Sequence, residues 1–162
     1  MILMRVYFFL IGILYTSGML YAQVPVQVTS DSVIYSVVKN HIQYLEDKNS
    51  NFSIDQVAQA TFLDNPSDVP GFFISASSFW VKFIIQNETE NPHLVINLEH
   101  ATIDDAVLYY RDDASGTFDS TELTEERPFR NRKYNYQTYM FDARINKGAQ
   151  KTFFLRVRAS EQ

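Results

Sequence analysis

Apolar and polar residues alternate in short runs along most of this chain, which is the pattern of β-strands that bury one face. The clearest run is Phe79–Asn87. One face of this run carries four apolar residues: Phe79, Val81, Phe83 and Ile85. The other face carries a mixed set: Trp80, Lys82, Ile84 and Gln86. The run therefore predicts a strand with one core face and a second face that borders water or a ligand.

Further runs of this kind predict about eight strands at roughly ten-residue spacing. They cover Ser32–Val38, His41–Glu46, Leu94–Glu99, Ala106–Arg111, Thr117–Leu123, Tyr134–Ala143 and Thr152–Arg158, with Val24–Val28 as a short extended stretch. A capping box, Ser53-Ile54-Asp55-Gln56, predicts a helix at about Ile54–Ala60. Short strands separated by polar turns predict an all-β fold: an antiparallel β-sandwich or jelly roll with one short helix.

The first 22 residues have the build of a secretory signal peptide. Arg5 supplies the positive end, Val6–Leu14 is an unbroken apolar run, and Ala22 offers a small residue at the cleavage point. The alternative is an uncleaved anchor helix, because Val6–Ala22 is nearly long enough to span a bilayer. We expect residues 1–22 to be the signal peptide and residues 23–162 to form one exported β-sandwich domain.

The chain stops at Gln162, soon after the apolar strand Thr152–Arg158. The last core strand of a sandwich usually has a neighbour on each side. We therefore expect that the domain lacks its last strand, or that a connection to a further segment begins here.

The composition narrows the choice of function. Arg5 is the only charged residue among residues 1–22, so the net charge of −5 becomes −6 when they are removed. This acidic balance, without a cluster of Lys or Arg, argues against a nucleic-acid partner. The absence of cysteine excludes disulfides, thiol chemistry and cysteine metal sites. The 13 Phe and 10 Tyr favour strands, and tyrosines can also form a contact surface.

The sequence contains no pattern that predicts catalysis, a cofactor or a metal site. The three histidines, His41, His93 and His100, lack the spacing that places two ligands on one face. No nucleophile motif and no phosphate-binding glycine loop occurs. Paired acids such as Asp104 and Asp105 would suit glycoside hydrolysis or a weak cation site, but adjacent acids on turns are ordinary solubility features. We therefore expect a protein that is not an enzyme.

The outward residues of two strands form the better candidate for a ligand site. They are Trp80 and Lys82 from one strand and Arg156 and Arg158 from the last. If the two strands share a sheet, an aromatic ring lies beside cations, and such a surface can stack a sugar ring or hold an anionic ligand. The structural alternative is that Trp80 closes a second core and that Arg156 pairs with Glu99 or Asp104.

A charged connection supplies three further candidates. Pro128–Lys133 contains Phe129, Arg130 and Arg132. We expect this connection to lie at an end of the sandwich, where loops commonly carry binding residues. The predicted ligand site therefore comprises seven residues: Trp80, Lys82, Phe129, Arg130, Arg132, Arg156 and Arg158.

Five motifs, spread over about residues 33–162, occur in a recognisable order. They are Tyr44–Asp47 followed by Ser53–Val57, Trp80–Phe83 with Asn87 at the strand end, Ile103–Tyr109, Pro128–Arg132, and Phe154–Ser160. In this order they resemble the type 2 extracellular sensor domain of bacterial seven-transmembrane receptors with diverse intracellular signalling modules (7TMR-DISM). Two departures are Lys82, where the family favours Arg, and Glu125-Glu126, which replace a Gly-Asp pair.

The resemblance implies a jelly-roll, carbohydrate-binding-type module at the periplasmic face of a bacterial inner membrane. Its implied role is the sensing of a carbohydrate or another small ligand, without catalysis, for a receptor with seven transmembrane helices and a cytoplasmic output module. The chain is then either a part of such a receptor, attached to the membrane through the missing part, or a free periplasmic version. The alternative function is a structural or protein-interaction sandwich without a small-molecule ligand.

Overall fold

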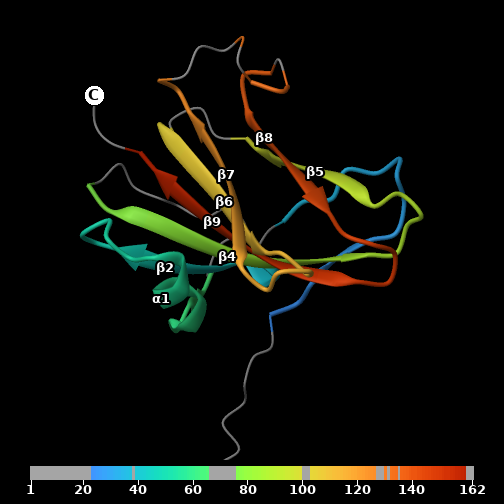
Figure 1. The fold of residues 1–162 in the computed structure, drawn as a ribbon, viewed down its shortest axis with the longest axis horizontal. Coiled ribbons are helices and arrows are strands. Elements are labelled where there is room, and N and C mark those ends of the chain that lie inside the picture. Colours follow the sequence, from blue (N-terminus) through green and yellow to red (C-terminus); the bar gives the residue numbers. More distant parts are fainter. Residues whose placement is uncertain are drawn as a thin grey trace, which may run out of the picture.

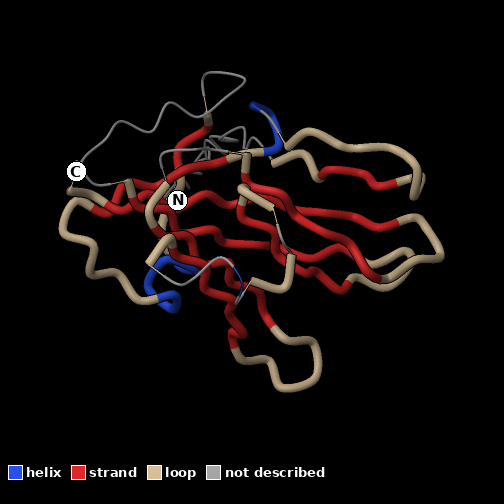
Figure 2. Tube along the Cα trace, turned by 90° about the horizontal axis from the view of Figure 1, so that it is seen from above, coloured by secondary structure: helices blue, strands red, loops and turns tan. Residues whose placement is uncertain are grey.

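The computed structural model describes residues 23–37, 39–65, 76–99, 103–126, 130, 132–134 and 136–159. These residues form two sheets that pack against each other, and the all-β prediction is confirmed (Figure 1). Figure 2 shows that strands and loops make up nearly all of this part of the chain, with helix confined to two short segments. Within the same residues, no helix has the length and apolar character needed to cross a membrane.

The larger sheet contains seven strands, six of them in the order β3-β2-β4-β9-β6-β7. Their bounds are β2 Gln43–Asp47, β3 Leu63–Asp64, β4 Ser78–Asn87, β6 Asp105–Arg111, β7 Phe118–Thr124 and β9 Gln150–Arg158. The seventh strand, β1 (Val26–Val28), pairs in parallel with the end of β4, on the edge whose other half pairs with β2. All other pairs in this sheet are antiparallel.

The smaller sheet is the antiparallel pair of β5 (His93–Leu98) and β8 (Tyr139–Arg144). It packs on one face of the larger sheet, which we call the inner face. Helix α1 (Ile54–Gln59) contacts the opposite, outer face, whereas the short 3-10 helix η1 (Lys39–His41) precedes β2. Figure 1 shows α1 and the β5–β8 pair on opposite sides of the larger sheet.

The main core lies between the two sheets. The predicted inward residues of β4 are there: Val81, Phe83 and Ile85 are buried, and Phe79 packs at the margin. Phe153 of β9 is fully buried, and its ring stacks on Phe83 with the centroids 5.4 Å apart. The period-two pattern of β4 and β9 thus places a continuous apolar layer at the centre of the molecule, and its burial is the main source of stability.

A second, smaller apolar cluster covers part of the outer face. Its buried members are Val57 of α1, Trp80 of β4 and Phe154 of β9. The predicted capping box holds the helix in place: Gln56 N donates to Ser53 Oγ at 3.3 Å, and Ser53 N donates to Gln56 Oε1 at 2.8 Å. The helix therefore starts where the sequence predicts, and its Val57 side chain seals this cluster.

The structure differs from the sequence prediction at the N-terminal side. Residues 32–37 of the predicted strand Ser32–Val38 belong to no strand. Instead Tyr35 Oη accepts hydrogen bonds from Thr29 N at 3.0 Å and Ser30 N at 2.9 Å, which folds the segment back on itself. The parallel pairing of β1 and the short β3 have no counterpart in the prediction. The predicted signal peptide, residues 1–22, lies outside the described residues.

Candidate functional site

The two strands that carry four of the predicted site residues are neighbours in the larger sheet. In the β4–β9 register Trp80 faces Arg156, Lys82 faces Phe154, and Ser78 faces Arg158. All of these side chains lie on the outer face, because the alternate residues of both strands are in the main core. The two strands therefore share a sheet, as the predicted ligand surface requires.

Trp80 is nevertheless not a surface ring, because its exposed fraction is only 1%. It packs in the outer cluster with Val57, and its ring centroid lies 5.5 Å from that of Tyr109. A ring enclosed in this way has no open face on which a sugar could stack. Of the two roles considered for Trp80, the structure shows the closing of a second core.

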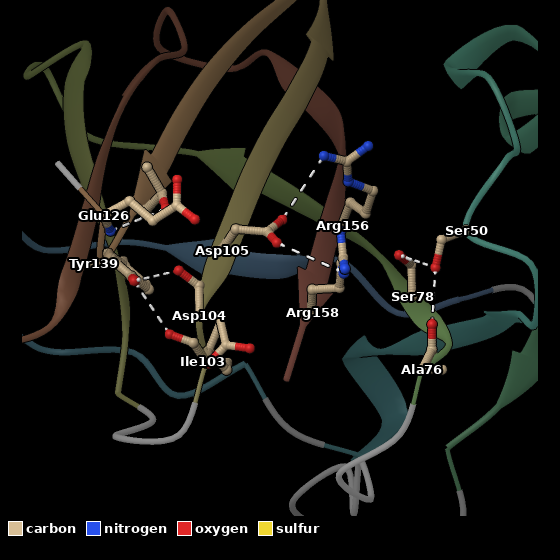
Figure 3. A network of polar contacts seen from close by, with 11 residues as sticks. Ser50, Ala76, Ser78, Ile103, Asp104, Asp105, Glu126, Tyr139, Arg156 and Arg158 are labelled. Carbon is tan, nitrogen blue, oxygen red and sulfur yellow. Dashed lines mark hydrogen bonds and ion pairs between the residues drawn. The ribbon is translucent and has the colours of Figure 1, made fainter. Parts of the chain in front are cut away.

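The two arginines at the end of β9 face a carboxylate from the neighbouring strand. Arg156 Nη2 lies 3.7 Å from Asp105 Oδ1, and Arg158 Nε lies 4.0 Å from Asp105 Oδ2 (Figure 3). Both distances exceed those of a hydrogen bond, and Asp105 Oδ1 and Arg156 Nε are buried without a hydrogen-bond partner within the described part of the chain. The predicted partner of Arg156 was Glu99 or Asp104, and the observed one is Asp105.

The pKa of Asp105 is raised although two arginines lie beside it. Burial is the main cause, and it outweighs the opposing effect of Arg156 and Arg158; Glu122 and Asp104 raise the pKa further. The long distances to the two arginines explain why burial has the larger effect on the pKa of Asp105, since the attraction of an ion pair weakens with distance while the cost of desolvation remains. The Arg156 and Arg158 cations thus have an internal counter-ion, and this makes them weaker candidates for a ligand.

A pH series should reveal the raised pKa. Because Asp105 holds its proton more tightly when folded, its contribution to stability is complete below the ordinary pKa of 3.8 and is lost as the pH rises through the folded pKa. We expect the stability of the wild type, relative to Asp105→Asn, to decrease from about pH 4 to pH 7 in urea unfolding. Asp31→Asn, at an exposed position, is the control for removing a surface carboxyl group elsewhere in the chain. Parallel curves for Asp105→Asn would contradict this account.

The charged connection between β7 and β8 contributes a structural arginine. Arg132 lies over the ring of Tyr139 at 4.7 Å, and its Nη2 donates to Thr124 O at 3.4 Å. Tyr139 Oη in turn lies 3.0 Å from Asp104 O and 3.1 Å from Ile103 O (Figure 3). Arg130 is exposed, and Phe129 lies outside the described residues.

A small hollow at this end of the sheet is acidic. Its volume is about 160 Å³, and it is lined by Asp104, Asp105, Thr124, Glu125, Glu126 and Arg158. Among the described residues, however, no three His, Asp or Glu side chains come together as metal ligands. Arg158 lines this hollow, whereas Lys82 lines a different and larger cavity. These two predicted site residues therefore do not share a cavity.

That larger cavity is a groove of about 390 Å³ on the outer face, between α1 and the β6–β7 hairpin. It is lined by Ala58, Lys82, Arg111, Asp113, Phe118, Gln150, Lys151, Thr152 and Phe154. Its volume lies in the range of about 300–1,000 Å³ that is usual for small-molecule sites. Among the described residues of the predicted site, only Lys82 belongs to its lining.

Three phenylalanine rings form a row at the groove. Phe154 is central, with the rings of Phe62 and Phe118 on either side, each at a centroid distance of 6.0 Å. Lys82 Nζ lies 5.6 Å from the Phe62 centroid, and Arg111 Cζ lies 4.7 Å from the Phe118 centroid. Each outer ring therefore has a cation beside it, which is a stabilising arrangement and leaves the charge near the surface.

The hairpin side of this groove was not predicted from the sequence. Arg111 ends β6, Phe118 begins β7, and the two face each other in the register of the pair. Arg111 Nη1 also donates to Gly116 O at 2.8 Å, which fixes the side chain at the turn. The available signal was the position of Arg111 at the end of an apolar strand, directly before the Asp-Gly turn.

The fold and this groove define the chain as an all-β sandwich domain with a ligand-sized cavity on its outer face. The sequence model of the family described as 7TMR-DISM extracellular 2 matches residues 39–162, and the chain belongs to this family. The resemblance stated from the motifs is thereby confirmed. The family consists of extracellular, outward-facing sensor domains of 7TMR-DISM receptors. A search of curated proteins found no match.

Proposed function

We propose that this domain binds a small, carbohydrate-like ligand in the periplasm and passes its presence to a membrane receptor, without catalysing a reaction. The observation that carries the proposal is the outer-face groove, which combines cations and aromatic rings in a domain of a sensor family. Membership of that family supports the sensor role, and the groove offers a cavity in which a ligand could bind.

The chemistry of the groove suits recognition of a sugar. Aromatic rings provide apolar contact area for the C–H face of a sugar ring, and Gln150 and Thr152 are polar groups for its hydroxyls. The main titratable cluster elsewhere, around Asp105, is an ion-pair arrangement with two arginines. These ion pairs account for the cluster, and no catalytic role is needed to explain it.

A protein-interaction sandwich is the second candidate. It is favoured by the exposed apolar side chains of Ile34 and Val33, which are 96% and 55% exposed. Strand β7 also has β6 as its only partner among the described strands and is largely exposed, so its outer edge is available for pairing with another chain. These features suit a docking role and make no use of the groove.

Thermal unfolding of the purified full chain against a panel of neutral and acidic mono- and oligosaccharides tests the proposal. A sugar that binds only the folded state raises the stability, by about 2.7 kcal/mol at 100 times its Kd, and the rise saturates. Glycerol at equal concentration is the control, because an excluded osmolyte gives a rise that does not saturate. A transition that no sugar shifts would contradict the proposal and favour the protein-interaction candidate.

A further inference from the structure

The groove carries an excess of positive charge in an acidic protein. Its lining contains three cations, Lys82, Arg111 and Lys151, and one carboxylate, Asp113. Asp113 lies 3.0 Å from Lys151 and neutralises it. Within the described ranges no ion pair involves Lys82 or Arg111, although the chain as a whole has a net charge of −5. The groove therefore brings together two cations that have no ion pair to a described residue.

Both cations keep hydrogen-bond donors for a ligand. A lysine ammonium has three donors, and the Lys82 ammonium donates no hydrogen bond to another described residue. An arginine has five N–H donors, and Arg111 uses one of them on Gly116 O. The contacts with Phe62 and Phe118 hold the two charges at the ends of the aromatic row without consuming these donors. The row between the charges is about as long as three rings.

We infer that the groove binds an acidic saccharide of one or two uronic acid units, whose carboxylates pair with Lys82 at one end of the aromatic row and with Arg111 at the other. This inference rests on the proposed function and specifies the ligand class of the same site. A carboxylate is the small anion that forms charge-assisted hydrogen bonds with both cation types. The sugar ring lies against the aromatic row, where its C–H groups contact Phe118, the half-buried ring of the lining.

The distribution of charge favours a compact anion over an extended one. Two unpaired cations match one or two carboxylates, and the remainder of the chain is acidic and repels a long polyanion such as nucleic acid. Lys82→Arg preserves the positive charge at this end of the aromatic row.

Titration calorimetry of the purified full chain tests the inference with digalacturonate and glucuronate as probes. Galactose and maltose are the neutral probes, and acetate tests a carboxylate without a sugar. We expect the two acidic sugars to bind, and Lys82→Gln or Arg111→Gln to weaken them about 10- to 100-fold, the usual effect of losing a hydrogen bond between charged partners. Lys82→Arg should retain binding. Arg144→Gln, which removes one exposed charge from β8, should change affinity less than twofold.

Each remaining outcome counts against a particular part of the inference. Neutral sugars that bind the wild type and Lys82→Gln equally well would overturn the acidic ligand and leave the proposed function standing. Acetate that binds as tightly as glucuronate would overturn the saccharide. If no sugar binds, both the inference and the carbohydrate role fall. A salt series on the wild type gives a readout without variants: affinity for digalacturonate should fall from about 50 to 500 mM NaCl, and a constant affinity would overturn the ion pair.

Discussion

Replacing Trp80 with alanine is expected to lower the free energy of unfolding by about 3–5 kcal/mol, the usual cost of deleting a large buried aromatic side chain. Trp80 is 1% exposed and is the largest side chain in the outer cluster. Its removal leaves a cavity between Val57 of α1 and the sheet, and it also releases the contact with Tyr109. Urea unfolding followed by circular dichroism measures the loss.

Two variants separate packing from other effects. Trp80→Phe keeps most of the buried ring, and the indole Nε1 that it removes has no hydrogen-bond partner among the described residues, so the loss should be clearly smaller. Tyr136→Ala deletes an aromatic side chain that is 62% exposed and should change stability by less than about 0.5 kcal/mol. A Trp80→Ala variant as stable as the wild type would refute the second core. A variant with reduced sugar affinity and unchanged stability would return Trp80 to the ligand site.

The case of Trp80 shows what alternation in a sequence can and cannot predict. The inward set of β4 was predicted correctly because four large apolar residues at period two have one physical explanation; they are Phe79, Val81, Phe83 and Ile85. The other face was ambiguous, since a tryptophan between polar residues suits both a ligand surface and a locally covered face. The position of α1 determines which of the two roles the outer face of β4 has. The capping box of α1 can be recognised in the sequence, but the place where the helix packs on the sheet depends on tertiary contacts.

The candidate site was predictable only on one side for a similar reason. Lys82 was identified from its outward position in β4, and it does line the groove. Arg111 and Phe118 belong to a hairpin that reaches Lys82 only through β9, which pairs with β4 on one edge and β6 on the other. This strand order results from contacts between residues more than 40 positions apart. No local pattern near Arg111 contains that information.

The strand Ser32–Val38 was predicted wrongly because β-propensity depends on a partner strand. Its β-branched residues favour an extended chain, but Ile34 is 96% exposed and the segment pairs with no described strand. Tyr35 provides a local alternative by accepting two backbone hydrogen bonds through its hydroxyl group. Local hydrogen bonds of this kind compete with a sheet ladder when the edge of the sheet is already occupied, here by β1 and β2.

Changing Asn87 to aspartate, a substitution of nearly equal size, should destabilise the domain by about 3–5 kcal/mol at neutral pH. Asn87 is fully buried at the end of β4. Its Nδ2 donates to Asn91 O at 2.9 Å and to Ile145 O at 2.8 Å, and its Oδ1 accepts from Thr89 N at 3.0 Å. The side chain thereby ties the β4–β5 turn to the β8–β9 turn. A carboxylate would place negative charge against two carbonyl oxygens, with no cation to compensate it among the hydrogen-bond partners of Asn87.

The pH dependence distinguishes buried charge from the mere loss of hydrogen bonds. The new carboxyl group would have a pKa above its unfolded value, so the deficit of Asn87→Asp relative to the wild type should shrink as the pH falls from 7 toward 4. Asn87→Ala, which loses the same bonds without a charge, should show a deficit that does not depend on pH. Asn146→Asp in the exposed β8–β9 turn is the matched control and should cost little. If Asn87→Asp unfolds at the wild-type urea midpoint at neutral pH, the side chain does not hold the two turns together. The asparagine at this strand end, which belongs to the motif shared with the sensor family, would then need a role other than a structural one.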